Sequence, residues 1–221
     1  METPHFIRIL GMSAPASAFS RVEFLVSAGI TGGLPPEDLP ELAFAGRSNV
    51  GKSSAINALA RRKRLAFVSK TPGRTQTINF FDLGGHGRLV DLPGYGYARV
   101  PQAVRAEWDQ LVGGYMSSRS TLAGVVLLMD ARHPFTPHDE TLFAWLRPAG
   151  KRLLILLSKC DKLSRQERVK VLKACRARLA ARAFDAEARL FSSVSGEGVE
   201  ETRTLLEGWI LAAGAGTKNP R

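Results

Sequence analysis

The residues with the most specific chemistry form one run, Gly46-Arg47-Ser48-Asn49-Val50-Gly51-Lys52-Ser53, which fits the phosphate-binding pattern GxxxxGK[ST]. Glycine lets such a loop approach phosphate groups, and successive backbone N–H groups form an anion nest at the start of the following helix. Lys52 adds a mobile positive charge for the β- and γ-phosphates, and the Ser53 hydroxyl can ligate Mg²⁺. Because the run stands between an apolar segment and an amphipathic one, a chance glycine turn is the weaker interpretation.

A second run, Asp91-Leu92-Pro93-Gly94, follows another short apolar segment. An aspartate at the end of a strand can hold the hydration shell of Mg²⁺, and the N–H of Gly94 can meet a γ-phosphate. Taken alone, this run is typical of an ordinary turn. Downstream of a phosphate-binding loop, it indicates the second half of a nucleoside triphosphate site.

Two further runs carry groups that suit a purine base, Ser158-Lys159-Cys160-Asp161 and Phe191-Ser192-Ser193. The carboxylate of Asp161 can accept hydrogen bonds from N1–H and N2–H₂ of guanine, a donor pair that adenine lacks. The aliphatic part of Lys159 can lie over the purine ring. The backbone N–H of Ser193 can reach the guanine carbonyl. Each run is weak evidence alone, and the order of all four motifs gives them their value.

Alternating strand-like and helix-like segments must position these residues. The predicted strands are residues 41–45, 77–83, 88–91, 124–130, 153–157 and 188–191. The predicted helices are residues 51–60, 102–119, 136–146, 165–183 and 199–211. Such alternation is typical of a doubly wound α/β domain, in which ligands bind at the carboxyl ends of the strands. The four motifs all follow predicted strands, as this arrangement requires.

We therefore predict a three-layer α/β domain with a mostly parallel six-stranded sheet, one antiparallel edge strand and flanking helices. The antiparallel pair comes from residues 77–91, where Gly84-Gly85-His86-Gly87 indicates a hairpin. Residues 1–40 are predicted to be an N-terminal extension that packs on or precedes this domain, with a short strand or helix around residues 21–28. The domain itself is assigned to residues 41–212, and residues 213–221 are expected to be a flexible tail that frays from Ala212 onward.

Composition limits the cellular setting and the partners. The chain has 221 residues, of which 31 are Lys or Arg and 20 are Asp or Glu, so its net charge is +11. Such a basic chain favours a polyanionic partner, with a merely solvated surface as the alternative. Cys160 and Cys175 suit neither a disulfide framework nor a tetrahedral metal site. No apolar run is long enough to span a membrane and no secretory signal is expected, so we predict a cytoplasmic protein.

With four motifs in this order, the chain resembles the translation-factor-related GTPases. Within them it is similar to the EngB family (also called YihA or YsxC), which are bacterial ribosome-biogenesis GTP-binding proteins. The resemblance extends from about Phe19 to Leu211 and is most specific in the central motifs. The runs that carry it are Gly46-Arg47-Ser48-Asn49-Val50-Gly51-Lys52-Ser53-Ser54, Thr71-Pro72-Gly73-Arg74-Thr75-Gln76, Asn79-Phe80-Phe81 and Asp91-Leu92-Pro93-Gly94-Tyr95-Gly96-Tyr97.

The resemblance implies a G domain that binds GTP and GDP with Mg²⁺ and hydrolyses GTP slowly as a molecular switch. It further implies a role in large ribosomal subunit assembly and in normal cell division and septation. The implied partners are the RNA and protein of the large subunit or its precursor, with no DNA or membrane partner. Nothing in the sequence demands an oligomer, so a monomer is expected.

The resemblance also assigns roles to individual residues. Residues 46–53 hold phosphate, residues 158–161 and 191–193 hold the base, and residues 91–94 begin switch II. Switch I comprises Gly73, Arg74, Thr75, Gln76 and Thr77. The implied Mg²⁺ ligands are Ser53 and Thr75. The implied catalytic groups are Lys52, Thr75 and Gly94.

Four positions qualify this interpretation. Ser158 stands where Asn is usual and Thr is common in the family, although a hydroxyl can still bridge to the phosphate loop. Ser193 stands where Ala is usual, which a backbone contact tolerates. Tyr95 occupies the place of the glutamine that orients water in Ras-like proteins, so intrinsic hydrolysis should be slow. A ribosomal partner, a rearranged switch or a K⁺ ion could complete the site, with Asn49 as the K⁺ ligand.

Two other classes of function compete with the switch. One is a basic RNA-binding assembly scaffold in which the guanine nucleotide is only structural. The other is a P-loop ATPase, against which Asp161 argues. Basic residues gather in Arg61-Arg62-Lys63-Arg64 with Lys70 and Arg74, and along a helix at Arg165, Arg168, Lys170, Lys173, Arg176, Arg178 and Arg182. His86, His133 and His138 are expected in loops or at a helix start, Asp130 is expected to shape a loop, and both cysteines are expected to pack.

Overall fold

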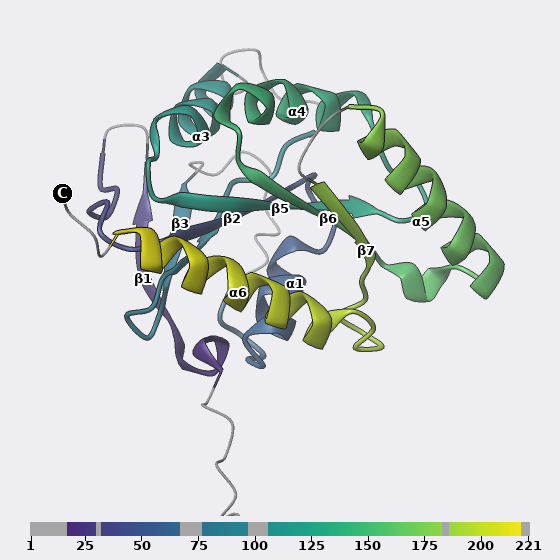
Figure 1. Ribbon diagram of the computed structural model, residues 1–221, viewed down its shortest axis with the longest axis horizontal. Helices are drawn as coiled ribbons and strands as arrows, with labels where there is room; N and C mark the ends of the chain where they lie inside the picture. The colour runs from purple at the N-terminus through teal and green to yellow at the C-terminus, as the bar shows by residue number, and fades with distance from the viewer. Residues whose placement is uncertain (1–16, 30–31, 67–76, 97–105, 183–185, 218–221) are drawn as a thin grey trace, which may run out of the picture.

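The structure, a computed structural model, describes residues 17–29, 32–66, 77–96, 106–182 and 186–217. Seven strands form one sheet in the order β1-β3-β4-β2-β5-β6-β7 (Figure 1). The strands are β1 (Val22–Ala28), β2 (Glu41–Gly46), β3 (Ile78–Leu83), β4 (Arg88–Asp91), β5 (Leu122–Asp130), β6 (Arg152–Ser158) and β7 (Ala186–Leu190). All six predicted strands are present, with ends that shift by one or two residues.

The sheet is parallel from β4 through β7 and antiparallel at its other edge. Strand β3 runs antiparallel to both of its neighbours, β4 and β1. The predicted mostly parallel sheet with an antiparallel edge is therefore confirmed, but the predicted count of six strands is one too few. The additional strand is β1, for which the sequence left strand and helix open. It joins the sheet by pairing Phe24 with Phe81, whose rings make an edge-to-face contact at 5.9 Å.

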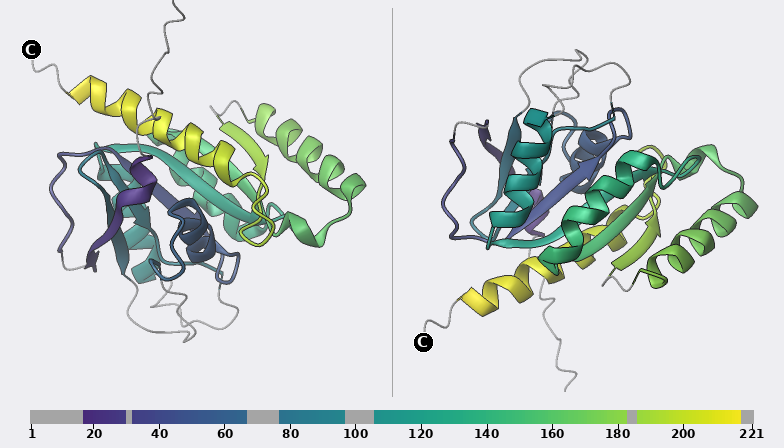
Figure 2. Two further views of the ribbon diagram at one scale, coloured as in Figure 1. Left: turned by 90° about the horizontal axis from the view of Figure 1, so that it is seen from below. Right: turned by 90° about the horizontal axis from the view of Figure 1, so that it is seen from above.

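Helices cover both faces of the sheet (Figure 2). On one face, α1 (Lys52–Leu59) and α6 (Val199–Thr217) share a core with Phe44 and Leu128. On the other, α3 (Gly114–Ser118), α4 (Pro137–Ala149) and α5 (Arg165–Ala180) enclose a second core around Val125 and Ile155. The sheet thus lies between two helical layers, as the three-layer prediction requires. Among the helices in the described part of the chain, none is long and apolar enough to cross a membrane.

Three predicted helix boundaries need comment. The helix expected at residues 102–119 is present over residues 106–118, interrupted by a π-helical segment, Asp109–Gly113, and its first residues lie outside the described ranges. Helix α5 ends at Ala180, and Ala183 is not among the described residues. The predicted end of α6 at Leu211 is wrong, since the helix continues to Thr217 through a run in which Ala212, Ala213 and Ala215 favour helix although Gly214 and Gly216 do not. Residues 218–221 of the predicted tail lie outside the description.

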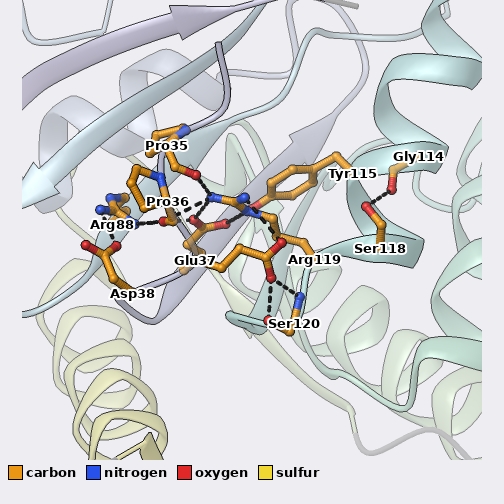
Figure 3. A network of polar contacts seen from close by, with 11 residues as sticks. Pro35, Pro36, Glu37, Asp38, Arg88, Gly114, Tyr115, Ser118, Arg119 and Ser120 are labelled. Carbon is orange, nitrogen blue, oxygen red and sulfur yellow. Dashed lines mark hydrogen bonds and ion pairs between the residues drawn. The ribbon is translucent and has the colours of Figure 1, made fainter. Parts of the chain in front are cut away.

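A buried polar network fixes the segment that leads into β2 (Figure 3). The Glu41 carboxylate, which is fully buried, accepts hydrogen bonds from Arg119 at 2.7 and 3.0 Å and from the Tyr115 hydroxyl at 2.8 Å. Arg119 also donates to the carbonyl of Pro35 at 2.6 Å. Because the buried charges are paired and hydrogen-bonded, the network ties the β1–β2 connection to the end of α3. It lies at the end of the sheet where β2 begins, opposite the predicted ligand site.

Candidate nucleotide-binding site

The phosphate loop occupies the turn between β2, which ends at Gly46, and α1, which begins at Lys52. Asn49 and Gly51 both have left-handed backbone conformations, with φ of 61° and 102°. Gly51 is the N-cap of α1, no side chain caps this helix start, and its first turn contains no acidic residue. The positive end of the helix dipole is therefore available to an anion, which fits a phosphate.

Lys52 and Asp91 meet beside this loop. The Lys52 ammonium donates to a carboxylate oxygen of Asp91, the last residue of β4, and both side chains are largely buried. Each charge thereby compensates the other in a setting where an unpaired charge would be costly. A phosphate group could replace Asp91 as the partner of Lys52, and a hydrated cation could replace Lys52 as the partner of Asp91. The pair therefore brings the two charges predicted from the sequence, the Lys52 ammonium and the Asp91 carboxylate, together beside the phosphate loop.

The turn after Asp91 packs directly on the phosphate loop. Ser48 N–H donates to the Tyr95 carbonyl at 2.8 Å, and Tyr95 N–H donates to the Gly46 carbonyl at 3.4 Å. A Cβ atom on Gly94 would lie 3.3 Å from the backbone of Ser48, so glycine favours this close approach. Trp108 donates its indole N–H to the Pro93 carbonyl at 2.9 Å. Gly94 therefore lies between two anchored residues, with Pro93 held by Trp108 and Tyr95 held by the phosphate loop.

The loop after β6 reaches back to the phosphate loop through two side chains. The buried Ser158 hydroxyl donates to the Val50 carbonyl at 2.8 Å. This bond confirms the prediction that serine, in the place where Asn is usual, can still bridge to the phosphate loop. Lys159 donates to the Asn49 carbonyl at 2.8 Å and lies 3.2 Å from a carboxylate oxygen of Asp130. The stem of Lys159 thus passes alongside the phosphate loop, where it can support a purine ring.

Asp161 is held by the loop after β7. The Ser192 hydroxyl donates to the Asp161 carboxylate at 2.7 Å, and Lys162 lies 3.4 Å away. The hydrogen bond from Ser192, followed by Lys162, lowers the pKa of Asp161 below its usual value. The carboxylate is therefore ionised at neutral pH and can accept hydrogen bonds from the guanine donors.

The two base loops are joined beneath the surface. Cys160 N–H donates to the Phe191 carbonyl at 3.3 Å, and both side chains are buried, whereas the Ser193 side chain is exposed. Burial raises the pKa of Cys160 to about 11, and it does the same for Cys175. Both cysteines are therefore packed thiols, as predicted. The exposed Ser193 side chain is consistent with a contact made through its backbone.

The described residues do not include every predicted site residue. Gly73, Arg74, Thr75 and Gln76 lie outside them, and Thr77 stands immediately before β3. The described ranges contain no cluster of three or more His, Cys, Asp and Glu side chains that could hold a metal. The side chains of His86, His133 and His138 are exposed.

Sequence analysis missed three residues at this site. Trp108 fixes Pro93, as described above. Asp130 bonds Arg132 within its loop, as predicted, but its contact with Lys159 was not anticipated. Asp139 bonds the Tyr95 hydroxyl at 2.5 Å. The spacing of Thr136 and Asp139 is that of a capping box and could have indicated the helix start, but not the contact with Tyr95.

A glycine loop at a helix start, a lysine–aspartate pair beside it and an ionised aspartate on a neighbouring loop, all at one end of a mostly parallel sheet, define a P-loop nucleotide-binding protein. Comparison with known proteins identifies the nucleotide. Residues 41–159 match the family model described as 50S ribosome-binding GTPase. The chain is 50% identical over 203 residues to the probable GTP-binding protein EngB of Azoarcus sp., covering 91% of this chain and 97% of that protein.

A second relative, the probable GTP-binding protein EngB of Thiobacillus denitrificans, is 52% identical to this chain over 196 residues. The match covers 89% of this chain and 94% of that protein. The chain therefore belongs to the EngB family of GTP-binding proteins and is a GTPase. A crystal structure of a probable GTP-binding protein engB, 22% identical, superimposes with a TM-score of 0.61 over 78% of this chain and 99% of that one. That similarity shows the shared fold.

Proposed function

We propose that this GTPase is a switch with a low intrinsic rate that assists assembly of the large ribosomal subunit and thereby supports cell division and septation. The observation that carries the proposal is the match of residues 41–159 to a family of 50S ribosome-binding GTPases. The net charge of +11 supports it, since ribosomal RNA is a polyanion. We further propose that the protein acts in the cytoplasm as a monomer.

The proposed nucleotide contacts follow the loops of the site. Residues 46–53 bind the phosphates, residues 158–161 and 191–193 bind guanine, and residues 73–77 and 91–94 form the switches. Lys52, Thr75 and Gly94 are the proposed catalytic groups. Ser53 and Thr75 are the proposed Mg²⁺ ligands, and the ion would neutralise the charge that develops on the phosphates. The acid-free, uncapped start of α1 and the nearby Asp91 support this assignment.

A low intrinsic rate is supported by the state of Tyr95. Its side chain is buried and its hydroxyl is engaged by Asp139. Burial, followed by the neighbouring Asp139 charge, raises the pKa of Tyr95, so the phenol stays neutral and cannot act as a general base at neutral pH. We therefore infer that another group completes the hydrolytic site. One candidate for this group is a K⁺ ion bound by Asn49. Equal hydrolysis rates in potassium chloride and in sodium chloride would exclude a role for K⁺.

Helix α5 supplies a cationic surface suited to RNA phosphates. Arg168 and Arg178 are tied to Glu197 and Glu140, at 2.7 and 2.8 Å. In contrast, Arg165, Lys170 and Lys173 are exposed on the same helix, and no ion pair is found for them within the described part of the chain. Glu167 is the sole acidic residue of α5 and caps its start. Charge complementarity therefore favours this helix as an RNA contact.

The test is co-sedimentation of the purified protein with large subunits and with their precursors, in GDP, in a non-hydrolysable GTP analogue and in ATP. A switch binds more tightly with the GTP analogue than with GDP. The alternative, a basic scaffold with a structural nucleotide, binds equally in both. Depletion of the protein in cells should cause large-subunit precursors to accumulate, and normal subunit profiles after depletion would refute the assembly role.

A further inference from the structure

The tyrosine that follows the switch II glycine is bonded to the first turn of a helix far away in the sequence. The Tyr95 hydroxyl donates to Oδ1 of Asp139 at 2.5 Å, and both side chains are buried. Asp139 is the third residue of α4. This contact connects α4 with residues 91–94, and the established GTPase activity gives it no role.

Asp139 is itself held in a fixed position. Its second carboxylate oxygen, Oδ2, accepts hydrogen bonds from the Thr136 N–H at 2.6 Å and from the Thr136 hydroxyl at 2.9 Å, in a capping box. The next residue, Glu140, pairs with Arg178 of α5 at 2.8 Å and with Arg182, just beyond the end of that helix, at 2.7 Å. The first turn of α4 is thus anchored on two sides, so Asp139 gives Tyr95 a rigid point of attachment.

The Tyr95 backbone transmits this attachment to the phosphate loop. It forms a parallel bridge with Arg47, with hydrogen bonds between the backbone groups of Tyr95 and those of Gly46 and Ser48. The ring also meets Trp108 edge-to-face at 5.5 Å. Gly94, which lies between Pro93 and Tyr95, consequently rests against Ser48, where a Cβ atom would make a tight contact at 3.3 Å. A γ-phosphate bound at the phosphate loop would meet Gly94 in this position.

We propose that Asp139 is a positioning residue of the GTPase: through Tyr95 it holds Gly94 against the phosphate loop, where its N–H can bind the γ-phosphate. The proposal rests on the function proposed above for Gly94. GDP has no γ-phosphate, so the Tyr95–Asp139 bond should affect GTP and hydrolysis but not GDP. A bond that only stabilises the fold would not distinguish the two nucleotides.

The chain offers a matched control. The Tyr115 hydroxyl also donates to a buried carboxylate, that of Glu41 at 2.8 Å, but at the opposite end of the sheet. Tyr95→Phe and Tyr115→Phe therefore delete the same kind of hydrogen bond, and only the first lies at the nucleotide site. A third variant, Asp139→Asn, keeps an oxygen that can accept from the Thr136 N–H and so preserves the helix cap.

The experiment measures affinity for GDP and for a GTP analogue, and the single-turnover rate of GTP hydrolysis, which excludes product release. A hydrogen bond to a charged group commonly contributes enough for a tenfold effect. We expect Tyr95→Phe to lower analogue affinity and hydrolysis about tenfold, with GDP affinity unchanged within about twofold. Adding Asp139→Asn to Tyr95→Phe should cause little further loss, because Tyr95→Phe has already removed the hydroxyl through which Asp139 acts. Tyr115→Phe should leave the ratio of analogue to GDP affinity unchanged.

The inference is overturned if Tyr95→Phe behaves like Tyr115→Phe, if GDP and analogue affinities fall together, or if hydrolysis becomes faster. Additive losses in the double variant would also count against it. Failure of the function proposed for Gly94 has a different signature. A Gly94→Pro variant lacks the backbone N–H, so full analogue affinity and hydrolysis in this variant would refute the role of Gly94 itself. If Gly94→Pro is defective and Tyr95→Phe is not, only the role of Asp139 fails.

Discussion

Replacing Ser192 with alanine should weaken guanine binding by changing how Asp161 is held. The Ser192 hydroxyl donates to Asp161 at 2.7 Å and accepts from the N–H groups of Val194 and Ser195 at 3.2 and 3.1 Å. Ser192→Ala frees the Asp161 carboxylate to rotate and releases two loop N–H groups. A hydrogen bond to a charged group contributes about 1.5–3 kcal/mol, of which part is regained through water. We expect a loss of about 1.4 kcal/mol, which is tenfold in affinity.

The assay is equilibrium fluorescence with labelled GDP and GTP analogue, and Ser193→Ala is the control. Ser193 is adjacent, but its side chain is exposed and its proposed contact is made by the backbone. We expect Ser193→Ala to bind within about twofold of the parent chain, as is usual for exposed sites. Equal affinities for Ser192→Ala and the parent, or equal losses in the two alanine variants, would refute the reasoning.

The pH dependence provides a second readout for the same variant. Ser192 is the largest contributor to the lowered pKa of Asp161, so Ser192→Ala moves that pKa up toward its ordinary value of about 4. Guanine binding requires the ionised carboxylate, so affinity is complete above the pKa and is lost as pH falls through it. The variant should therefore lose affinity at a higher pH than the parent. Identical pH profiles would contradict the assigned cause of the shift.

Three further changes test other parts of the structure. Asp161→Asn should lose guanine nucleotides and gain xanthine nucleotides, whereas unchanged GTP binding, or binding of ATP, would overturn the base-site assignment. Arg119→Ala leaves the buried Glu41 carboxylate without its main partner, so urea denaturation should show about 3–5 kcal/mol of lost stability, and a loss below about 1 kcal/mol would contradict the network. Lys170→Glu with Lys173→Glu should weaken association with large-subunit precursors and flatten its salt dependence, while GDP affinity stays the same.

The sequence determined the parts of this protein that depend on neighbouring residues. The phosphate loop is one contiguous run, because glycine, lysine and serine must follow one another where a strand turns into a helix. The same holds for Asp91 to Gly94 and for the two base loops, each at the end of a predicted strand. These local patterns indicated the fold class and the class of ligand before any contact was known. The bridge from Ser158 to the phosphate loop could also be anticipated, since an equivalent side chain occupies that position in related proteins.

Only the tertiary structure decided what lies between those runs. The pairing of Phe24 with Phe81 places β1 in the sheet, although its residues fit a strand or a helix equally well. The bonds of Tyr95 with Asp139 and of Ser192 with Asp161 join residues 44 and 31 positions apart. No local pattern encodes such a contact, because it depends on how α4 and the strand ends pack together. The sequence therefore specified which groups meet the nucleotide, and the packing of distant segments specified what holds those groups in place.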